Sequence, residues 1–339
     1  MLDEKMSFDF EENHLKEELT KRAPKIVLLQ LPEGLKPQAP HLAKIVQESG
    51  ALPVVSSDPC YGACDLAVSE AKLLGADLII HYGHTAMIQN SEIPTVYFEA
   101  PLKIGIKEVI TKALSLLEDW NKIGLITTVQ HIQQLDEVKN LFEAAGKTVF
   151  VGNAGRFQHP GQVLGCDFSN ALAVLENVEA YVFVGGGRFH AIGAALATGK
   201  PTIIADPYEQ LAYPIHDQTR RIVMQRWANI SEAKNAKHFG ILVSLKPGQM
   251  KFKDAQNMKG KLEKKGFFTI LFALKEISPR ALMQFPTIDA FVNTACPRLA
   301  LDDAPNFDKP ILSIKETLVL LGELKWEDLL KNGWLENAT

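Results

Sequence analysis

Continuous apolar runs alternate with helical segments along this chain of 339 residues. Runs such as 26–29, 78–80 and 180–184 carry an apolar side chain at every position. A strand of this kind is covered on both faces, which is typical of a parallel sheet lying between helices. The pattern therefore predicts an α/β protein built from short parallel sheets flanked by helices.

The same order of strands and helices recurs three times along the chain. Glycines that end a helix precede the second strand of each repeat, and X-Pro pairs open the fourth strand, where the missing N–H of proline is tolerated. These residues are Gly50, Gly146 and Gly266, and Pro94, Pro201 and Pro310. The repeat predicts three similar α/β units, at 1–120, 121–236 and 237–339, packed around a pseudo-threefold centre. Helices over 1–24 and 107–120 are expected to open and to end the first unit.

Composition and charge narrow the classes of partner. Of the residues in the chain, 46% are hydrophobic and 22% are charged. The net charge of −4 shows no excess of basic residues of the kind that binds nucleic acid. The acidic stretch 1–18 lacks the basic and apolar regions of a signal peptide, and no apolar run is long enough for a membrane helix. We therefore expect a cytoplasmic protein without a membrane or nucleic-acid partner, in which thiols stay reduced.

Three of the four cysteines lie in loop-like sequence beside glycine or proline, one in each third of the chain: Cys64, Cys166 and Cys296. Each follows a predicted strand, at the end of a parallel sheet where sites are usually found. Three thiolates suit zinc or a 4Fe–4S cluster with one iron left open. Three unrelated loop thiols are the alternative. Cys60 forms a Cys-x₃-Cys pair with Cys64, and is interpreted as a loop thiol near the site.

Polar and glycine-rich loops end strands on the same side as these cysteines, including 83–85, 185–190 and 246–249. Glycines let backbone N–H groups approach a ligand closely, as a nucleotide-like molecule requires. The candidate binding residues in these loops are Gly186, Gly187, His131 and Gln249. Alternatively, Gly186 and Gly187 only form a turn between a strand and a helix, and His131 is a loop histidine without a role in binding.

Several longer motifs carry more specific information: Tyr61-Gly62-Ala63-Cys64-Asp65, Gln130-His131, the stretch 160–166, the stretch 244–249, and Ala295-Cys296-Pro297-Arg298 followed by Asp302-Asp303. With these motifs the chain resembles the archaeal 2-(3-amino-3-carboxypropyl)histidine synthase family of diphthamide biosynthesis, from about residue 25 to 322. The resemblance implies a homodimer of three-unit subunits, each with a 4Fe–4S cluster held by Cys64, Cys166 and Cys296. Cys60 has no counterpart in the motif, so it is a spare thiol or an alternative ligand.

The resemblance also implies the reaction. S-adenosylmethionine would bind the open iron, and the reduced cluster would donate an electron that breaks the bond to the γ-carbon. A 3-amino-3-carboxypropyl radical, or its iron-bound equivalent, would then be placed on the imidazole C2 of a histidine in translation elongation factor 2. An unidentified electron donor is needed. The chain lacks a CxxxCxxC loop, the usual motif of radical S-adenosylmethionine enzymes, and the family shares this absence.

Two other functions stay open at this point. A quinolinate-synthase-like enzyme would also carry one cluster cysteine in each of three α/β units, but would act on small metabolites. A non-catalytic, cluster-bearing partner subunit is the other alternative. The lysine-rich stretch 251–265 could dock an acidic protein, although a solvated helix face explains it more simply.

Overall fold

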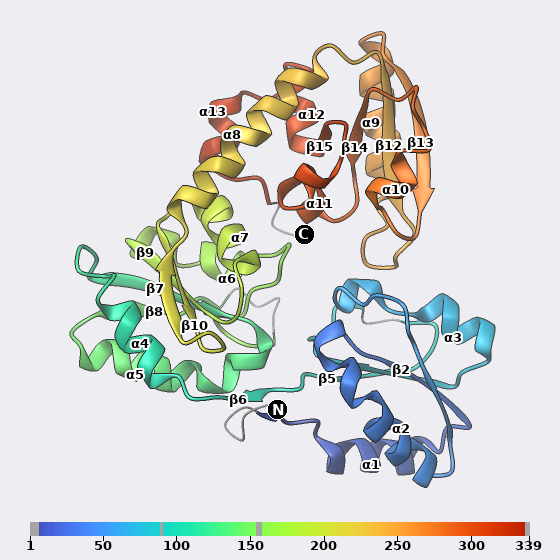
Figure 1. Cartoon of the computed structure of the whole chain (residues 1–339), viewed down its shortest axis with the longest axis vertical. Helices are drawn as coiled ribbons and strands as arrows, with labels where there is room; N and C mark the ends of the chain where they lie inside the picture. The colour runs from blue at the N-terminus through green and yellow to red at the C-terminus, as the bar shows by residue number, and fades with distance from the viewer. Residues whose placement is uncertain (1–6, 89–90, 154–157, 336–339) are drawn as a thin grey trace. The chain divides into compact units, whose positions relative to one another are not determined.

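The computed structural model of the chain describes residues 7–88, 91–153 and 158–335 (Figure 1). It separates into two compact units. The first comprises 1–105 together with the short segments 129–133 and 246–248, and the second comprises the rest of the chain. Each unit is described by itself.

The first unit is built on a four-stranded parallel sheet with the order β3-β2-β4-β5. Its central strands β2 and β4 are apolar except for Gln30 and His81, and core side chains lie on both faces of the sheet. A short antiparallel pair, β1 with β6, lies outside this sheet. The elements are β1 Ser7–Phe8, α1 Glu12–Arg22, β2 Ile26–Gln30, η1 Glu33–Gln38, α2 Ala39–Glu48, β3 Leu52–Val55, η2 Ala63–Asp65, α3 Val68–Leu74, β4 Leu78–Tyr82, β5 Thr95–Phe98 and β6 Leu102–Lys103.

The second unit contains two sheets. One has the order β11-β10-β9-β7-β8 and is parallel except for β11, which runs antiparallel to β10. Its elements are α4 Lys107–Leu114, β7 Lys122–Thr127, α5 Leu135–Ala144, β8 Thr148–Phe150, α6 Ser169–Leu172, η4 Leu175–Asn177, β9 Ala180–Val184, α7 Phe189–Thr198, β10 Thr202–Asp206 and β11 Leu211–Pro214. Between β7 and α5 lies η3 Val129–Gln134, whose residues 129–133 belong to the first unit.

The other sheet of the second unit is parallel, with the order β13-β12-β14-β15. The helix α8, His216–Ala233, contacts α7 beside one sheet and α12 and β15 of the other. Its buried Arg226 pairs with the equally buried Glu316 at 2.7 Å. The remaining elements are β12 His238–Ser244, α9 Phe252–Lys264, β13 Phe268–Leu274, α10 Pro279–Leu282, β14 Ala290–Asn293, α11 Pro297–Leu301, η5 Ala304–Asn306, β15 Ile311–Ser313, α12 Ile314–Leu320 and α13 Trp326–Asn332.

The predicted fold class is confirmed: short parallel sheets are flanked by helices. The three glycines predicted to end helices all have positive φ, at 90° for Gly50, 83° for Gly146 and 88° for Gly266. This backbone conformation favours glycine, which explains the repeat of this residue. The three prolines directly precede β5, β10 and β15. The pseudo-threefold arrangement and the three unit boundaries stay predictions.

Three details of the sequence prediction are wrong. The first helix begins at Glu12 and not at the chain start, and β1 precedes it; residues 1–6 lie outside the described part. The helix α4 ends at Leu114 and not at Trp120, and it packs on β10 and β11. Finally, the antiparallel strand β11 was not predicted, because its apolar run is only three residues long and is followed by a proline.

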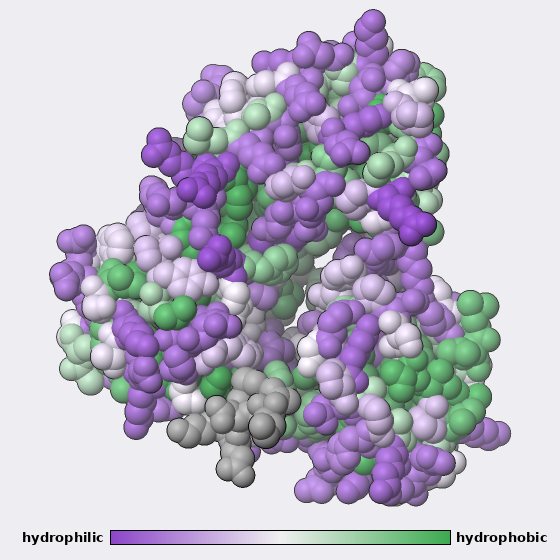
Figure 2. All heavy atoms as spheres, in the orientation of Figure 1, coloured by the Kyte–Doolittle hydropathy of each residue, from purple (hydrophilic) through white to green (hydrophobic). Residues whose placement is uncertain are grey.

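Hydrophilic side chains cover much of the face shown in Figure 2, and hydrophobic side chains gather in patches among them, most clearly at the lower right. Every helix in the described part of the chain is too short or too polar to cross a bilayer. In the first unit, Leu73 of α3 is 89% exposed and Leu52 of β3 is 58% exposed. Single exposed apolar side chains of this kind are normal on protein surfaces.

Candidate functional site

Cys64 lies in the turn η2, which follows β3 at the carboxyl end of the first sheet. The segment 246–248 belongs to the same compact unit and lies against this turn. The backbone N–H of Gly248 donates to the carbonyl of Cys64 at 2.8 Å. A Cβ at Gly248 would come within 2.6 Å of the Cα of Cys64, so only glycine fits at this position. The cysteine backbone is therefore held in place while its side chain stays partly exposed.

A buried ion pair fixes the same turn from its other end. Lys246 Nζ lies 3.0 Å from the Asp65 carboxylate, and the two residues are only 6% and 7% exposed. The ammonium of Lys246 also lies 4.2 Å from the ring centroid of Tyr61, at the distance of a cation–π contact. The carbonyl of Asp65 accepts from Gln30 Nε2 at 2.7 Å, which ties the turn to the end of β2. The residues on both sides of Cys64 are thus anchored.

Cys166 lies at the tip of a tight turn after β8. Leu164 and Asp167 form an antiparallel bridge, with Gly165 and Cys166 between them. The Asp167 carboxylate accepts from the backbone N–H of Ser169 at 3.0 Å and so supports the start of α6. At the base of the loop, Gly161 has φ of 73° and lies close to Leu135 and Val151. The loop is closely packed at its base, and the cysteine at its tip is partly exposed.

Cys296 lies between β14 and α11, where Pro297 occupies the first helical position. The side chain of Asn293 fixes this connection: its Nδ2 donates to the carbonyl of Cys296 at 2.6 Å, and its Oδ1 accepts from the N–H of Ala295 at 3.0 Å. The thiol of Cys296 is partly exposed, like those of Cys64 and Cys166.

Phe189 and Arg298 connect the Cys166 and Cys296 loops within the second unit. The Phe189 ring packs on Gly165, where a Cβ would lie 2.2 Å from Cε1 of the ring. The guanidinium of Arg298 lies 3.8 Å from the centroid of that ring, and Nη2 donates to the Phe189 carbonyl at 2.6 Å. One aromatic side chain therefore contacts the neighbour of Cys166 and the residue two positions beyond Cys296.

The charge of Arg298 is balanced within its own helix. Its Nε forms a short ion pair with Asp302, and Arg298 is 3% exposed. Burial lowers the pKa of the Arg298 guanidinium, and burial also raises the pKa of the Asp302 carboxyl against the lowering effect of Arg298. The sequence motif contained both residues, but their contact could not be read from it. The pair stabilises the helix that begins directly after Cys296.

The glycine loop after β9 is ordered by an aspartate. The Asp206 carboxylate accepts from the N–H of Gly187 at 3.0 Å and from the N–H of Tyr208 at 2.9 Å. The Tyr208 ring covers Gly186, where a Cβ would lie 2.8 Å from Cδ2. One N–H of the predicted ligand loop is therefore already bonded within the protein. The role of Gly186 and Gly187 in binding a ligand stays a prediction.

The other two candidate ligand residues lie in different units. His131 is 1% exposed and belongs to the first unit, where its neighbour Gln130 donates to the carbonyl of Gly83 at 2.7 Å. Gln249 belongs to the second unit and its Oε1 lies 3.5 Å from the hydroxyl of Ser244. Similarly, Cys64 lies in the first unit, and Cys166 and Cys296 lie in the second. The convergence of all three cysteines on one site stays a prediction.

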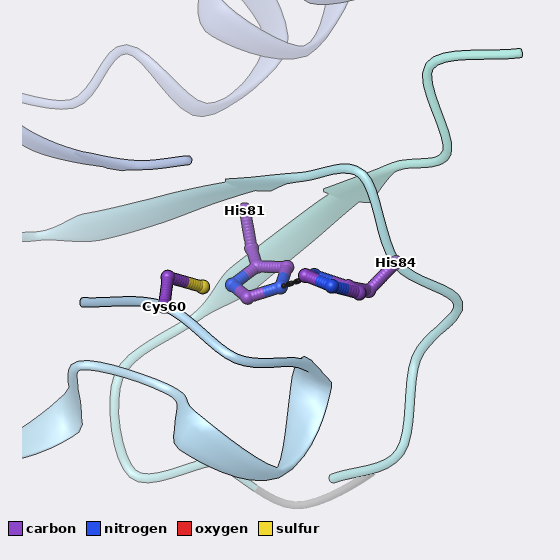
Figure 3. A group of neighbouring side chains, drawn as sticks. All are labelled: Cys60, His81 and His84. Carbon is purple, nitrogen blue, oxygen red and sulfur yellow. Dashed lines mark hydrogen bonds between the residues drawn. The ribbon is translucent and has the colours of Figure 1, made fainter. Parts of the chain in front are cut away.

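The structure reveals a further group that the sequence did not indicate. Cys60, His81 and His84 place their sulfur and nitrogen ligand atoms within 4.8 Å of one another (Figure 3). The only sequence signal was a polar residue, His81, in the apolar strand β4, followed three positions later by a second histidine. Cys60 is 2% exposed and points toward the His81 ring (Figure 3).

Comparison with known proteins gives a consistent result. A family model described as "Putative diphthamide synthesis protein" matches residues 31–330. The chain is 36% identical over 330 residues to the 2-(3-amino-3-carboxypropyl)histidine synthase of Pyrococcus horikoshii, covering 96% of this chain and 95% of that protein. It is 31% identical over 308 residues to subunit 1 of the corresponding Gallus gallus synthase, covering 89% of this chain and 74% of that protein.

Solved structures give the same picture. The crystal structure of Dph2 from Pyrococcus horikoshii with a 4Fe-4S cluster matches with a TM-score of 0.86 at 36% identity, covering 94% of this chain and 92% of that chain. A crystal structure of Dph2 from the same organism, described without mention of a cluster, matches equally well. The fold and nearly the whole length of the chain are thus shared with these proteins.

Proposed function

Because this chain belongs to the family of diphthamide synthesis proteins, we propose that it transfers a 3-amino-3-carboxypropyl group to the imidazole C2 of a histidine, the first step of diphthamide biosynthesis. It is an enzyme of the transferase class. The observation that carries the proposal is the 36% identity to a synthase of this name over 96% of the chain. The relatives reported above carry the name of this synthase, which favours the proposal over the quinolinate-synthase-like alternative.

The residues of this chain fit a 4Fe–4S cluster held by Cys64, Cys166 and Cys296. All three are partly exposed cysteines in loops that follow strands. Thiolates are the usual protein ligands of such clusters, and three of them leave one iron open. The related crystal structure described with a 4Fe-4S cluster supports this assignment. Cys60 is a poorer candidate because its sulfur is buried and points toward His81 (Figure 3).

The cosubstrate of the proposed reaction is S-adenosylmethionine. When bound and reduced, the cluster would supply the electron that breaks the bond between the sulfonium and the γ-carbon. The protein orients the reactants and excludes water. Gly186, Gly187, His131 and Gln249 are the proposed contacts to S-adenosylmethionine. Asp206 would hold the glycine loop in shape for this contact through its hydrogen bond to Gly187.

The substrate is proposed to be translation elongation factor 2. Its target histidine must reach a site that already holds S-adenosylmethionine, so it should project on a protruding loop while the rest of the factor stays outside. We also propose that the enzyme is a cytoplasmic homodimer that uses a separate electron donor. Sedimentation at micromolar concentration tests the dimer, and a monomer would contradict it.

The proposed chemistry is tested with anaerobically reconstituted protein, S-adenosylmethionine and a reductant. Formation of methylthioadenosine is expected, because cleavage at the γ-carbon leaves the methylthio group on the adenosyl part. The same assay distinguishes the enzyme from a non-catalytic cluster-bearing subunit. Protein with a full complement of iron and sulfide that forms no methylthioadenosine would contradict the proposal.

A further inference from the structure

The side chains of Cys60, His81 and His84 meet in the first unit, at the ends of β3 and β4. Cys60 and His81 are 2% and 0% exposed, whereas His84 is partly exposed. In Figure 3 the His81 ring lies between the thiol of Cys60 and the ring of His84. The group is thus buried on one side and reachable from solvent at His84.

Hydrogen bonds fix which nitrogen of each histidine carries a proton. Gln30 Nε2 donates to the Asp65 carbonyl at 2.7 Å and its Oε1 accepts from the Ala67 N–H at 3.1 Å, so the orientation of the amide is set. The Nδ1 of His81 lies 2.9 Å from the same Oε1 and must donate to it. The Nε2 of His81 therefore carries the lone pair, which faces His84 Nδ1 at 2.9 Å.

We propose that Cys60, His81 and His84 form a binding site for one divalent transition-metal ion of the zinc class, separate from the cluster cysteines. In this site the ion lies between His81 Nε2 and His84 Nδ1, the ring proton of His84 moves from Nδ1 to Nε2, and the sulfur of Cys60 completes a three-residue ligand set. The proposal does not depend on the proposed transferase function.

The distances are close to those that such an ion requires. Zinc binds histidine nitrogen at about 2.0–2.1 Å and cysteine sulfur at about 2.3 Å in tetrahedral geometry, so two nitrogens lie about 3.3 Å apart and a nitrogen and the sulfur about 3.6 Å apart. The two nitrogens lie 2.9 Å apart and would separate by about 0.4 Å. The three atoms lie within 4.8 Å of one another, so the widest pair has to close by no more than about 1.2 Å.

The surroundings resemble those of metal-binding histidines. Such a histidine usually donates its second ring N–H to a carbonyl or carboxylate oxygen, which fixes the tautomer, and Gln30 accepts this bond from His81. Burial lowers the pKa of both histidines, to about 4 for His84, so both are neutral and carry a lone pair at pH 7. His81 binds through a nitrogen that already carries the lone pair, and His84 binds after its ring proton has moved from Nδ1 to Nε2.

The thiol requires a counter-charge. Burial and the nearby carboxylates of Asp65 and Glu33 raise the pKa of Cys60 to about 12, so the thiol is protonated when no ion is bound. A divalent cation would compensate the thiolate charge and displace the thiol proton to solvent. Binding should therefore release protons and become tighter as the pH rises.

The test uses the full-length chain with Cys64→Ser, Cys166→Ser and Cys296→Ser, which leaves Cys60 as the single cysteine of the original four. The metal-free protein is titrated with Co²⁺ and then with Zn²⁺. We expect one equivalent of Co²⁺, a thiolate-to-cobalt charge-transfer band in the ultraviolet, and displacement by Zn²⁺. Any such band must come from Cys60. No band, or more than one equivalent without a band, would overturn the proposal.

Two further variants test the ligand set in the same background. Cys60→Ser should abolish the band, and His84→Ala should weaken Co²⁺ binding at least tenfold; His84 is partly exposed and tolerates truncation. His238→Ala is the matched control, because His238 is an exposed histidine paired with Asp289. If Cys60→Ser does not fold, the thermal midpoint decides: one equivalent of Zn²⁺ should raise it in the parent but not in His84→Ala. Equal rises in both would mean that the group is only a hydrogen-bonded core cluster.

Discussion

The backbone N–H of Gly248 donates to the carbonyl of Cys64 at 2.8 Å, and the two backbones lie too close for any side chain between them. A cysteine proposed to bind the cluster is thus held by a glycine distant in sequence. This contact explains the sequence around both residues, because the turn that carries Cys64 and the segment 246–248 have to pack closely against one another.

Gly248→Ala is predicted to lower cluster occupancy several-fold without unfolding the chain. The added Cβ would lie 2.6 Å from the Cα of Cys64 and would displace the turn. Iron and sulfide content after anaerobic reconstitution measures the effect. Gly260→Ala is the control, since that glycine lies inside α9 with open space around its Cβ position. The control should bind a full cluster and gain about 1 kcal/mol of stability. Equal occupancy in both variants would contradict the role of Gly248.

Lys246→Met is predicted to destabilise the protein by about 3 kcal/mol, because it leaves the Asp65 carboxylate buried without its partner. The double variant Lys246→Met with Asp65→Asn should recover much of this loss. Urea denaturation of all three proteins measures the coupling. Lys44→Met is the control: its pair with Glu48 is exposed and should contribute less than about 1 kcal/mol. A loss below that in Lys246→Met would refute the anchoring role.

The metal-free protein is predicted to lose stability as the pH falls from 6.5 toward 4. Burial lowers the pKa of His84 from 6.5 to about 4, while a hydrogen bond to the backbone of Tyr82 and the nearby Glu33 carboxylate act in the opposite direction. Between these values the unfolded chain binds a proton that the folded chain does not, so the free energy of unfolding falls with pH. For His84 alone the difference corresponds to about 3 kcal/mol. His81, whose pKa is also lowered by burial, adds to the same trend.

Denaturation in the presence of a chelator at several pH values measures this dependence. His84→Gln should flatten the curve between pH 6.5 and 4, because glutamine does not titrate. His41→Gln is the control, since His41 is half-exposed and paired with Glu12 on the surface. An unchanged slope in His84→Gln would show that His84 titrates normally in the folded protein.

Much of the fold could be predicted from sequence because the signals were local. Apolar runs located the strands within one or two residues, and Gly50, Gly146 and Gly266 marked helix ends that require positive φ. The hairpin to β11 had no such signal. Its turn includes Gln210 at φ of 53°, where a glycine would have marked the turn.

The site was predictable only in part, for a related reason. Glycine and proline around Cys64, Cys166 and Cys296 indicated loops, and the structure places all three in loops or turns that follow strands. The ion pair of Lys246 with Asp65 joins residues far apart in sequence, so no local pattern could reveal it. His81 lies in an apolar run, and the sequence gives no sign that it contacts Cys60 and His84. Only the fold of the first unit brings these three side chains together.

Replacing any one of Cys64, Cys166 and Cys296 by alanine is predicted to abolish stable cluster binding, because three thiolates are the proposed ligand set. Cys60→Ala should keep the cluster, since its sulfur points toward His81 in the interior (Figure 3). Iron and sulfide counts with an absorption spectrum measure both results. Loss of the cluster in Cys60→Ala together with retention in Cys64→Ala would show that the ligands were assigned wrongly.

The most direct test of the proposed function is mass spectrometry of elongation factor 2 after treatment with reduced, cluster-loaded enzyme and S-adenosylmethionine. We predict a gain of one 3-amino-3-carboxypropyl group on a single histidine, and no gain with the Cys166→Ala variant. Methylthioadenosine is measured in the same mixture to show that S-adenosylmethionine has been cleaved. An unmodified histidine in a mixture that contains methylthioadenosine would contradict elongation factor 2 as the substrate.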